Sequence, residues 1–390
     1  MSQNTEDKTY DINIDRLKAE AVANIDQSII NELMEIDTSN EPLIQNNPDM
    51  FSLNELSKSD AAELEHYKTH QKAYWPAEEV TMDRDIIDFV NILYDQTSFD
   101  LTPTQKAENK KKNDDARYFI KMILAFFAAA DGIVNANIGR LVNEITNPYV
   151  KLYYTFQMMM EGIHSESYSV MLKTLVPDPV ELKNLFRAIY NSPSIRQKAV
   201  FALKYLEHPD PTHYINSKNS LALRLVAAAT TELIQFSSSF AAIYWIRAAS
   251  KGKMVGLSQF NKQIARDEGL HGTHHCDLYN REIKNRLPVH IVYKVLNEAY
   301  EFEKQFFSES LPVALVGINA GEMDIYVRMV VIRLSEMLGY PPIAPAVKNP
   351  FPFMEKINMN GRENLHEVAS GEYKNEKAGD LIKWGAKMNF

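Results

Sequence analysis

The sequence predicts an all-α protein built as a bundle of long helices, and three observations support this prediction. First, four stretches are much longer than a strand and carry apolar residues at intervals of three and four; they cover residues 119–138, 149–175, 217–250 and 257–283. Second, few glycines or prolines interrupt these stretches. Third, the turn signals that mark β-hairpins are missing from the sequence.

Composition divides the chain into three parts. Residues 1–65 are polar and acidic, and we expect a mobile arm with one or two short helices. Residues 66–345 form the helical domain. Residues 346–390 are expected to be an extended tail, since five prolines between Pro341 and Pro352 end the helical pattern. Within the helical domain, residues 105–115 (QKAENKKKNDD) are too charged for a core and are predicted to form an exposed loop.

The overall composition excludes several classes of protein. A net charge of −9 argues against a general nucleic-acid binder, which usually carries a basic face. A single cysteine, Cys276, excludes an internal disulfide framework and suits a reducing compartment. The N-terminus lacks the apolar segment of a signal peptide, and the longest apolar stretches without a charged residue are too short to span a bilayer. We therefore expect a cytoplasmic protein without a membrane partner.

Two copies of the motif Glu-Xxx-Xxx-His stand out in the helical domain. The first copy joins Glu161 to His164, and the second copy joins Glu268 to His271. Residues three apart on a helix share one face, so each copy can direct a carboxylate and an imidazole at one point. Each copy is preceded by a carboxylate inside an apolar helical stretch, Asp131 before the first and Glu232 before the second.

Each of these residues has an ordinary interpretation when taken alone. A single Glu-Xxx-Xxx-His on a helix usually binds no metal, and a single carboxylate in an apolar stretch is usually exposed or paired with a cation. Six such residues in a regular order are different, because four buried carboxylates would repel one another strongly. Two divalent cations would cancel the four negative charges. Two trivalent cations would leave two positive charges, which one bridging oxide would cancel. The pattern therefore predicts a dinuclear, oxygen-activating metal site.

The ligand types indicate which metal and which fold. Oxygen and nitrogen ligands without thiolate favour iron, with manganese as the alternative. Four inward-facing helices that supply carboxylates and two Glu-Xxx-Xxx-His motifs are typical of ferritin-like dimetal carboxylate proteins. Here an aspartate, Asp131, stands where that pattern usually has a glutamate. We therefore predict a ferritin-like helical bundle with two metal ions per chain in its core.

Several neighbours share the helix faces of the predicted ligands. Tyr168 lies four residues after the histidine of the first motif, where most tyrosines are simply core residues but where this one would be an oxidisable group. Phe236 and Phe240 follow the third carboxylate by four and eight residues, and Ile264 precedes the second motif by four. These three are ordinary core residues or the apolar wall of a pocket that would exclude water and reductants.

Two further histidines, His274 and His275, follow the second motif. His275 lies four residues after His271 and so shares its face. We favour a solvated residue or a partner of a ligand over a seventh metal ligand.

Six segments in order carry a resemblance to a known family. They are WPAEEVTMDRD (75–85), FFAAADGIVNANI (126–138), EGIHSESYS (161–169), TELIQFSSSF (231–240), ARDEGLH (265–271) and NPFPFME (349–355). The chain resembles the small, radical-generating subunit of class I ribonucleotide reductase over about residues 70–373. The sequences of these segments are more similar to the eukaryotic and large-virus branch than to the enterobacterial one. The resemblance implies an oxidoreductase that works with a large subunit to convert ribonucleotides into deoxyribonucleotides for DNA replication.

The resemblance also implies roles for individual residues. One iron would be held by Asp131, Glu161 and His164, and the other by Glu232, Glu268 and His271. The reduced metal centre would react with O2 and leave a stable radical on Tyr168.

Further residues are implied to carry that radical onward. Trp75 and Asp267 match the residues that pass the radical between the metal centre and the surface, together with His164. Tyr373 matches the tyrosine that hands it to the large subunit. The C-terminal tail would dock on that subunit, and the small subunit would be a homodimer.

Some positions depart from the family pattern. Arg328 stands where an acidic residue is usual, and the tail contains Lys383, Trp384 and Lys387 where acidic residues are common. These departures concern partner recognition rather than the metal site.

Three rival interpretations stay open at this point. Iron storage or ferroxidase activity would use a similar metal site but gives no role to Trp75, Tyr168 or the tail. A related oxidase acting on an organic ligand usually lacks a tyrosine at position 168. A metal-free scaffold would leave the four buried carboxylates unexplained.

Overall fold

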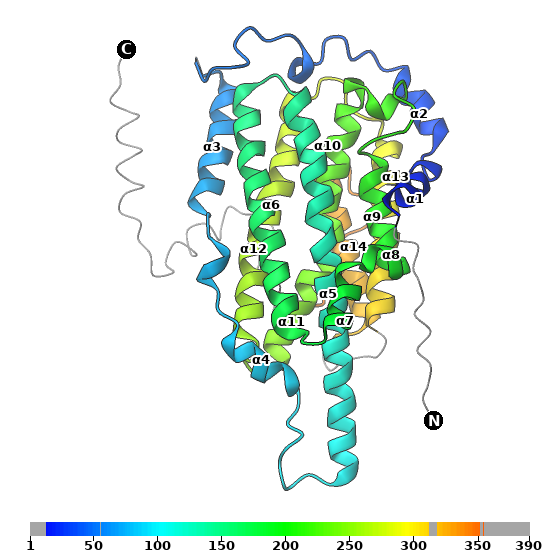
Figure 1. The fold of residues 1–390 in the computed structure, drawn as a ribbon. Helices are drawn as coiled ribbons and strands as arrows, with labels where there is room; N and C mark the ends of the chain where they lie inside the picture. The colour runs from blue at the N-terminus through cyan, green and yellow to red at the C-terminus, as the bar shows by residue number, and fades with distance from the viewer. Residues whose placement is uncertain (1–12, 55, 312–317, 352–353, 355–390) are drawn as a thin grey trace, which may run out of the picture.

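All secondary-structure elements of the described chain are helices, which confirms the all-α prediction (Figure 1). The computed structural model describes residues 13–54, 56–311, 318–351 and residue 354. The expected tail, with Tyr373, Lys383, Trp384 and Lys387, lies outside the described residues apart from its first few positions.

The centre of the bundle consists of long helices that match the four predicted stretches. They are α5 (Pro103–Glu144), α6 (Pro148–Leu175), α10 (Leu221–Thr230), the π-helix η5 (Thr231–Gln235), α11 (Ser237–Ala249) and α12 (Val255–Glu282). Helices α5 and α6 each begin with a proline at the first turn, where no backbone N–H is needed. Thr102 and Asn147 cap these two starts by accepting hydrogen bonds from the first-turn backbone.

The remaining elements surround this centre. They are α3 (Lys58–Lys72), α4 (Asp83–Val90), α7 (Pro179–Phe186), α8 (Ala188–Asn191), α9 (Pro193–Lys204), α13 (Val289–Ser310), α14 (Ala320–Met337) and the short 3-10 turns η1 (Pro42–Ile44), η2 (Ala77–Glu79), η3 (Tyr214–Asn216) and η4 (Lys218–Ser220). One continuous core of buried apolar side chains joins the central and outer helices. The four ligand-bearing helices therefore stand on a packed scaffold rather than on loops.

The prediction of a loop at residues 105–115 is wrong, because this segment is the N-terminal part of α5. Figure 1 shows it extending below the bundle as a free helical arm. Glu108 and Lys110–Lys112 are exposed, as expected, but Lys110 pairs with Asp114 and Lys111 with Asp115 at a spacing of four. Such pairs stabilise a solvated helix, so high charge excluded a core position without excluding a helix.

The described part of the N-terminal segment contains two short helices. It forms α1 (Ile14–Ala23) and α2 (Gln27–Met34), and Leu17 of α1 packs with residues of α9. Ile30, Leu33 and Leu43 belong to the main core. The boundary expected after residue 65 falls inside α3, so this helix connects the N-terminal segment directly to the bundle.

Among the described residues, one helix is long and apolar enough to cross a membrane. This is α5, whose most apolar window has half of its residues buried inside the bundle. A core helix of a globular protein passes the same test of length and composition, and α5 also carries the buried carboxylate Asp131.

Candidate metal centre

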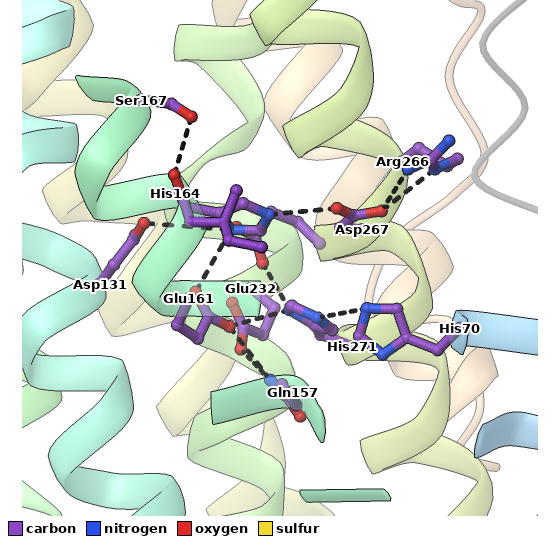
Figure 2. Close-up of polar contacts among 12 residues, drawn as sticks. His70, Asp131, Gln157, Glu161, His164, Ser167, Glu232, Arg266, Asp267 and His271 are labelled. Carbon is purple, nitrogen blue, oxygen red and sulfur yellow. Dashed lines mark hydrogen bonds and ion pairs between the residues drawn. The ribbon is translucent and has the colours of Figure 1, made fainter. Parts of the chain in front are cut away.

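The six predicted ligand residues converge inside the bundle. Figure 2 labels five of them: Asp131, Glu161, His164, Glu232 and His271. None of the six is more than 3% exposed; they are Asp131 of α5, Glu161 and His164 of α6, Glu232 of η5, and Glu268 and His271 of α12. The helices thus bring together side chains that are far apart in sequence, since Asp131 and His271 are separated by 140 positions. Sequence spacing selected the correct set of converging residues.

Two of the carboxylates belong to two donor groups at once. Asp131 and His164 lie with Glu161 and Glu268 in one group, and Glu232 and His271 lie with the same two glutamates in the other. Within each group the donor atoms are all within 4.8 Å of one another. The resemblance assigned each glutamate to a single ion, whereas this geometry makes both glutamates available to two ions.

The histidines face these shared carboxylates through Nδ1. His271 Nδ1 lies 2.9 Å from Glu161 Oε1 and 2.9 Å from Glu268 Oε2. His164 Nδ1 lies 3.0 Å from Glu268 Oε1 and 3.4 Å from Glu161 Oε2. Both imidazoles can therefore present the same ring nitrogen to an ion between the carboxylates.

Several buried atoms at the centre lack a hydrogen-bond partner within the described structure. They are both carboxyl oxygens of Asp131, Glu161 Oε2, Glu232 Oε2, Glu268 Oε1 and His164 Nδ1. A buried polar atom without a partner costs about 1–3 kcal/mol, and these atoms all belong to one cluster. Metal ions bound among them would supply the missing partners, so the residues fit a dinuclear centre.

Without an ion, the cluster offsets its own repulsion with protons. Burial raises the pKa of Asp131 well above its usual value, and Glu161 and Glu268 raise it further. Burial and the same glutamates raise the pKa of Glu232. Burial lowers the pKa of His271, but Glu161 and Glu268 outweigh it and raise the pKa to about 9. Two divalent cations could replace the charge that these protons carry.

Glu232 lies on the π-helix between α10 and α11. A π-turn inserts one extra residue into a helix and often marks a functional site. Nearby, the buried Lys198 donates a hydrogen bond to the Gln235 carbonyl at 2.5 Å and pairs with Glu303 at 2.7 Å. Glu303 accepts a hydrogen bond from the Ser238 N–H at 2.9 Å, so the ion pair holds both the last turn of the π-helix and the first turn of α11.

We expect Lys198→Met to destabilise the protein by about 3–5 kcal/mol, because it leaves the buried Glu303 carboxylate without its cationic partner. The double variant Lys198→Met with Glu303→Leu should recover most of that loss, since no charge then stays buried. Equilibrium unfolding in urea measures both. A single variant that unfolds at the wild-type urea concentration would show that the pair does not stabilise this region.

The predicted radical site, Tyr168, is enclosed by aromatic rings. Its hydroxyl is buried and has no hydrogen-bond partner in the described structure. Phe127 stacks on the Tyr168 ring at 4.8 Å between centroids and contacts Phe236 at 5.6 Å and Phe240 at 5.2 Å. Burial, followed by the charge of Asp131, raises the pKa of Tyr168 well above its usual value.

This pocket differs in one detail from the predicted one. Phe236 and Phe240 reach Tyr168 through Phe127, which the sequence analysis did not single out. Phe127 lies four residues before Asp131, so the spacing argument could have found it. Ile264 is buried in the main core, as expected of a wall residue.

The residues predicted to transfer the radical, Trp75 and Asp267, are connected to His164 through its Nε2. Trp75 Nε1 donates a hydrogen bond to Asp267 Oδ2 at 2.7 Å, and His164 Nε2 lies 3.2 Å from the same oxygen. Arg266 donates to the second oxygen of Asp267 at 2.9 and 3.0 Å. The Trp75 and His164 rings are stacked, with centroids 6.1 Å apart. Asp267 thus joins an indole to a candidate metal ligand.

Three polar neighbours of the centre were not predicted. Gln157 Nε2 donates to Glu232 Oε1 at 3.0 Å, and it lies four residues before Glu161, a spacing that could have identified it. His70 of α3 places its Nε2 3.3 Å from His271 Nε2. Glu63, also of α3, lies 2.7 Å from His274 Nε2. Nothing in the polar sequence of α3 distinguishes His70 or Glu63 from exposed residues.

Comparisons with known proteins show the family of this chain. A family model described as "Ribonucleotide reductase, small chain" matches residues 106–350. The ribonucleoside-diphosphate reductase small chain of Trypanosoma brucei brucei is 38% identical over 340 residues, which cover 87% of this chain and 90% of the relative. Small chain 1 of the Saccharomyces cerevisiae enzyme is 39% identical over 318 residues, which cover 81% and 71%. The solved structure of the ribonucleotide reductase Rnr4 homodimer from Saccharomyces cerevisiae is 28% identical, with a TM-score of 0.67 over 91% of this chain and 97% of that one.

Proposed function

Because this chain belongs to the ribonucleotide reductase small-chain family and has the function of a ribonucleoside-diphosphate reductase small subunit, we propose that it holds two iron ions beside a radical-storing Tyr168. The six-residue carboxylate and histidine cluster supports this proposal, since its residues are buried and several of its oxygen atoms lack a hydrogen-bond partner in the described structure. Manganese accepts the same oxygen and nitrogen donors. When bound, the two ions would supply, with O2, an oxidant able to remove one electron from a phenol.

The surroundings of Tyr168 are suited to forming and keeping a radical. A phenol that loses an electron also releases its hydroxyl proton, and Asp131 is the charged group that acts most strongly on this hydroxyl. Phe127, Phe236 and Phe240 then keep water and reductants from the ring. We infer that storage of the radical depends on this apolar wall.

We propose that the radical leaves through the connected group of His164, Asp267 and Trp75. The hydrogen bonds to one oxygen of Asp267 allow a proton to shift between indole and imidazole as charge moves. Tyr373 would carry the radical on to the large subunit, where ribonucleotide reduction takes place, and the C-terminal tail would dock there. Iron storage or ferroxidase activity does not require a hydrogen-bonded connection from a metal ligand to a tryptophan, so this group favours the reductase function.

We also propose that the chain is a cytoplasmic homodimer. The Saccharomyces cerevisiae structure is described as a homodimer. In the chain described here, α6 carries ligand residues on its inner face while Met159 and Val170 on the same helix are exposed. A Cβ added at Gly162, between these two residues, would meet no atom within 4 Å. Sedimentation equilibrium of the purified protein tests the dimer, and a monomer at micromolar concentration would contradict it.

The radical proposal is tested by electron paramagnetic resonance after ferrous iron and O2 are added to the metal-free protein. We expect a tyrosyl signal in the wild type and none in Tyr168→Phe, with equal iron content in both. Tyr153→Phe is a matched control, because Tyr153 is equally buried on the same helix but donates its hydroxyl to the Leu270 carbonyl. A signal that persists in Tyr168→Phe would place the radical elsewhere.

The pKa values at the centre predict how metal binding depends on pH. In the absence of metal the pKa of His271 is about 9, so this imidazole is protonated at neutral pH and must lose its proton to bind an ion. Affinity for Mn²⁺ should therefore rise with pH through the neutral range, by about tenfold per pH unit for each proton displaced. Titrations of the metal-free protein between pH 6 and 9 measure this. An affinity that does not change with pH would exclude His271 as a protonated ligand.

A further inference from the structure

The histidine pair His274 and His275 separates into two different environments in the fold. His274 turns away from the metal centre and pairs with Glu63 at 2.7 Å. His275 lies four residues after His271 on the same face of α12 and is fully buried. Its Nε2 has no hydrogen-bond partner in the described structure and lies 4.0 Å from Glu232 Oε1.

A close approach of two helices brings His275 to this place. Gly272 of α12 packs against Leu233, the residue after Glu232 on the π-helix. A Cβ at position 272 would lie 2.3 Å from Leu233 Cγ, which no real pair of atoms tolerates. The missing side chain at Gly272 therefore lets α12 and η5 come together and sets His275 opposite Glu232.

The other ring nitrogen of His275 is held by Tyr154. The Tyr154 hydroxyl lies 3.0 Å from His275 Nδ1, and both side chains are fully buried. If the phenol donates to Nδ1, the ring proton is on Nε2 and points toward the Glu232 carboxylate. The opposite tautomer would place a nitrogen lone pair against a carboxylate oxygen, which is repulsive, and would leave the phenol proton without its acceptor.

The two oxygens of Glu232 differ accordingly. Oε1 accepts a hydrogen bond from Gln157 Nε2 at 3.0 Å and faces His275, whereas Oε2 has no hydrogen-bond partner in the described structure. A shift of about 1 Å would bring His275 Nε2 and Oε1 to hydrogen-bond distance. Oε1 thus has one N–H donor and a second imidazole nitrogen nearby, whereas Oε2 has no protein partner in the described structure.

We propose that His275 is a positioning residue for Glu232, donating its Nε2–H to Oε1 so that Oε2 is presented to a metal ion. This inference rests on the proposed metal centre. Tyr154, His275 and Gln157 would then orient Glu232 at the second metal position. At the first metal position, Asp267 contacts the predicted ligand His164. Groups that orient metal ligands in this way commonly contribute 10–100-fold to metal affinity.

The test is an oxygen-free titration of the metal-free protein with Mn²⁺, in which free Mn²⁺ is followed by its electron paramagnetic resonance signal. His275→Asn, whose short amide does not reach Glu232, should weaken one of the two ions by about 10–100-fold and leave the other unchanged. His275→Gln keeps an N–H at about the reach of Nε2 and should bind both ions as the wild type does. Tyr154→Phe should weaken the same ion to a smaller extent.

The controls separate positioning from other roles. His274→Gln alters the neighbouring histidine and should leave both affinities unchanged. Thermal unfolding followed by circular dichroism shows whether each variant is folded. The Mn²⁺ affinities of His275→Gln and His275→Asn are compared at a temperature at which both variants are folded. Wild-type affinity in His275→Asn would overturn the proposal, as would equal losses in Asn and Gln, which would make His275 a metal ligand. A wild type that binds fewer than two ions would instead refute the metal centre itself.

Discussion

Glu161→Ala is expected to empty both metal positions, whereas Glu232→Ala should empty only one. The reason is geometric, since Glu161 and Glu268 are members of both donor groups while Glu232 is a member of one. Removing Glu161 takes a ligand from each ion and one of four negative charges from the cluster. Glu161 Oε1 also lies 2.9 Å from His271 Nδ1, so the second histidine loses the carboxylate that it faces.

Metal content after reconstitution with ferrous iron, measured by mass spectrometry of the protein freed of excess metal, checks this expectation. The tyrosyl signal should vanish in both variants, because each removes part of a two-ion centre. Glu166→Ala is the matched control, since Glu166 is an exposed glutamate on the same helix. Equal loss of one ion in Glu161→Ala and Glu232→Ala would show that each glutamate serves a single ion, as the family resemblance implied.

The converging ligands could be predicted from sequence because they combine helical spacing with an apolar context. A carboxylate inside an apolar helix needs a compensating charge, and Asp131 and Glu232 show this in their local sequence alone. Glu161 and Glu268 add a histidine three residues later. Their sharing between two donor groups could not be predicted, because it depends on how α6 and α12 pack rather than on either helix alone.

Other features were missed because their cause lies outside the local sequence. His70 reaches the centre from α3, a helix whose charged composition resembles a solvated surface. The π-helix around Glu232 depends on tertiary contacts with Lys198 and Glu303 from two other helices. The arm at residues 105–115 is helical because charges paired at a spacing of four stabilise it and Asn113 bonds to the backbone of Leu93 and Tyr94.

Asp267→Asn should separate radical storage from turnover. The carboxylate is fully buried, yet Arg266 and His164 outweigh the effect of burial and hold its pKa below the usual value, so it stays an anion. One oxygen accepts from Trp75 at 2.7 Å and faces His164 at 3.2 Å, so the anion fixes both rings through a single atom. An asparagine keeps the shape but removes the charge and turns one acceptor into a donor.

We therefore expect Asp267→Asn to keep both metal ions and the Tyr168 signal but to lower ribonucleotide reduction with the large subunit by about 10–100-fold or more. Activity, iron content and the tyrosyl signal measured on one preparation check this. Arg266→Gln is a useful companion, because it removes the charge that faces the other oxygen of Asp267 and should cause a smaller loss. If Asp267→Asn lost the metal and the radical together with turnover, Asp267 would act by positioning His164 as a ligand, and transfer through Trp75 would need another partner.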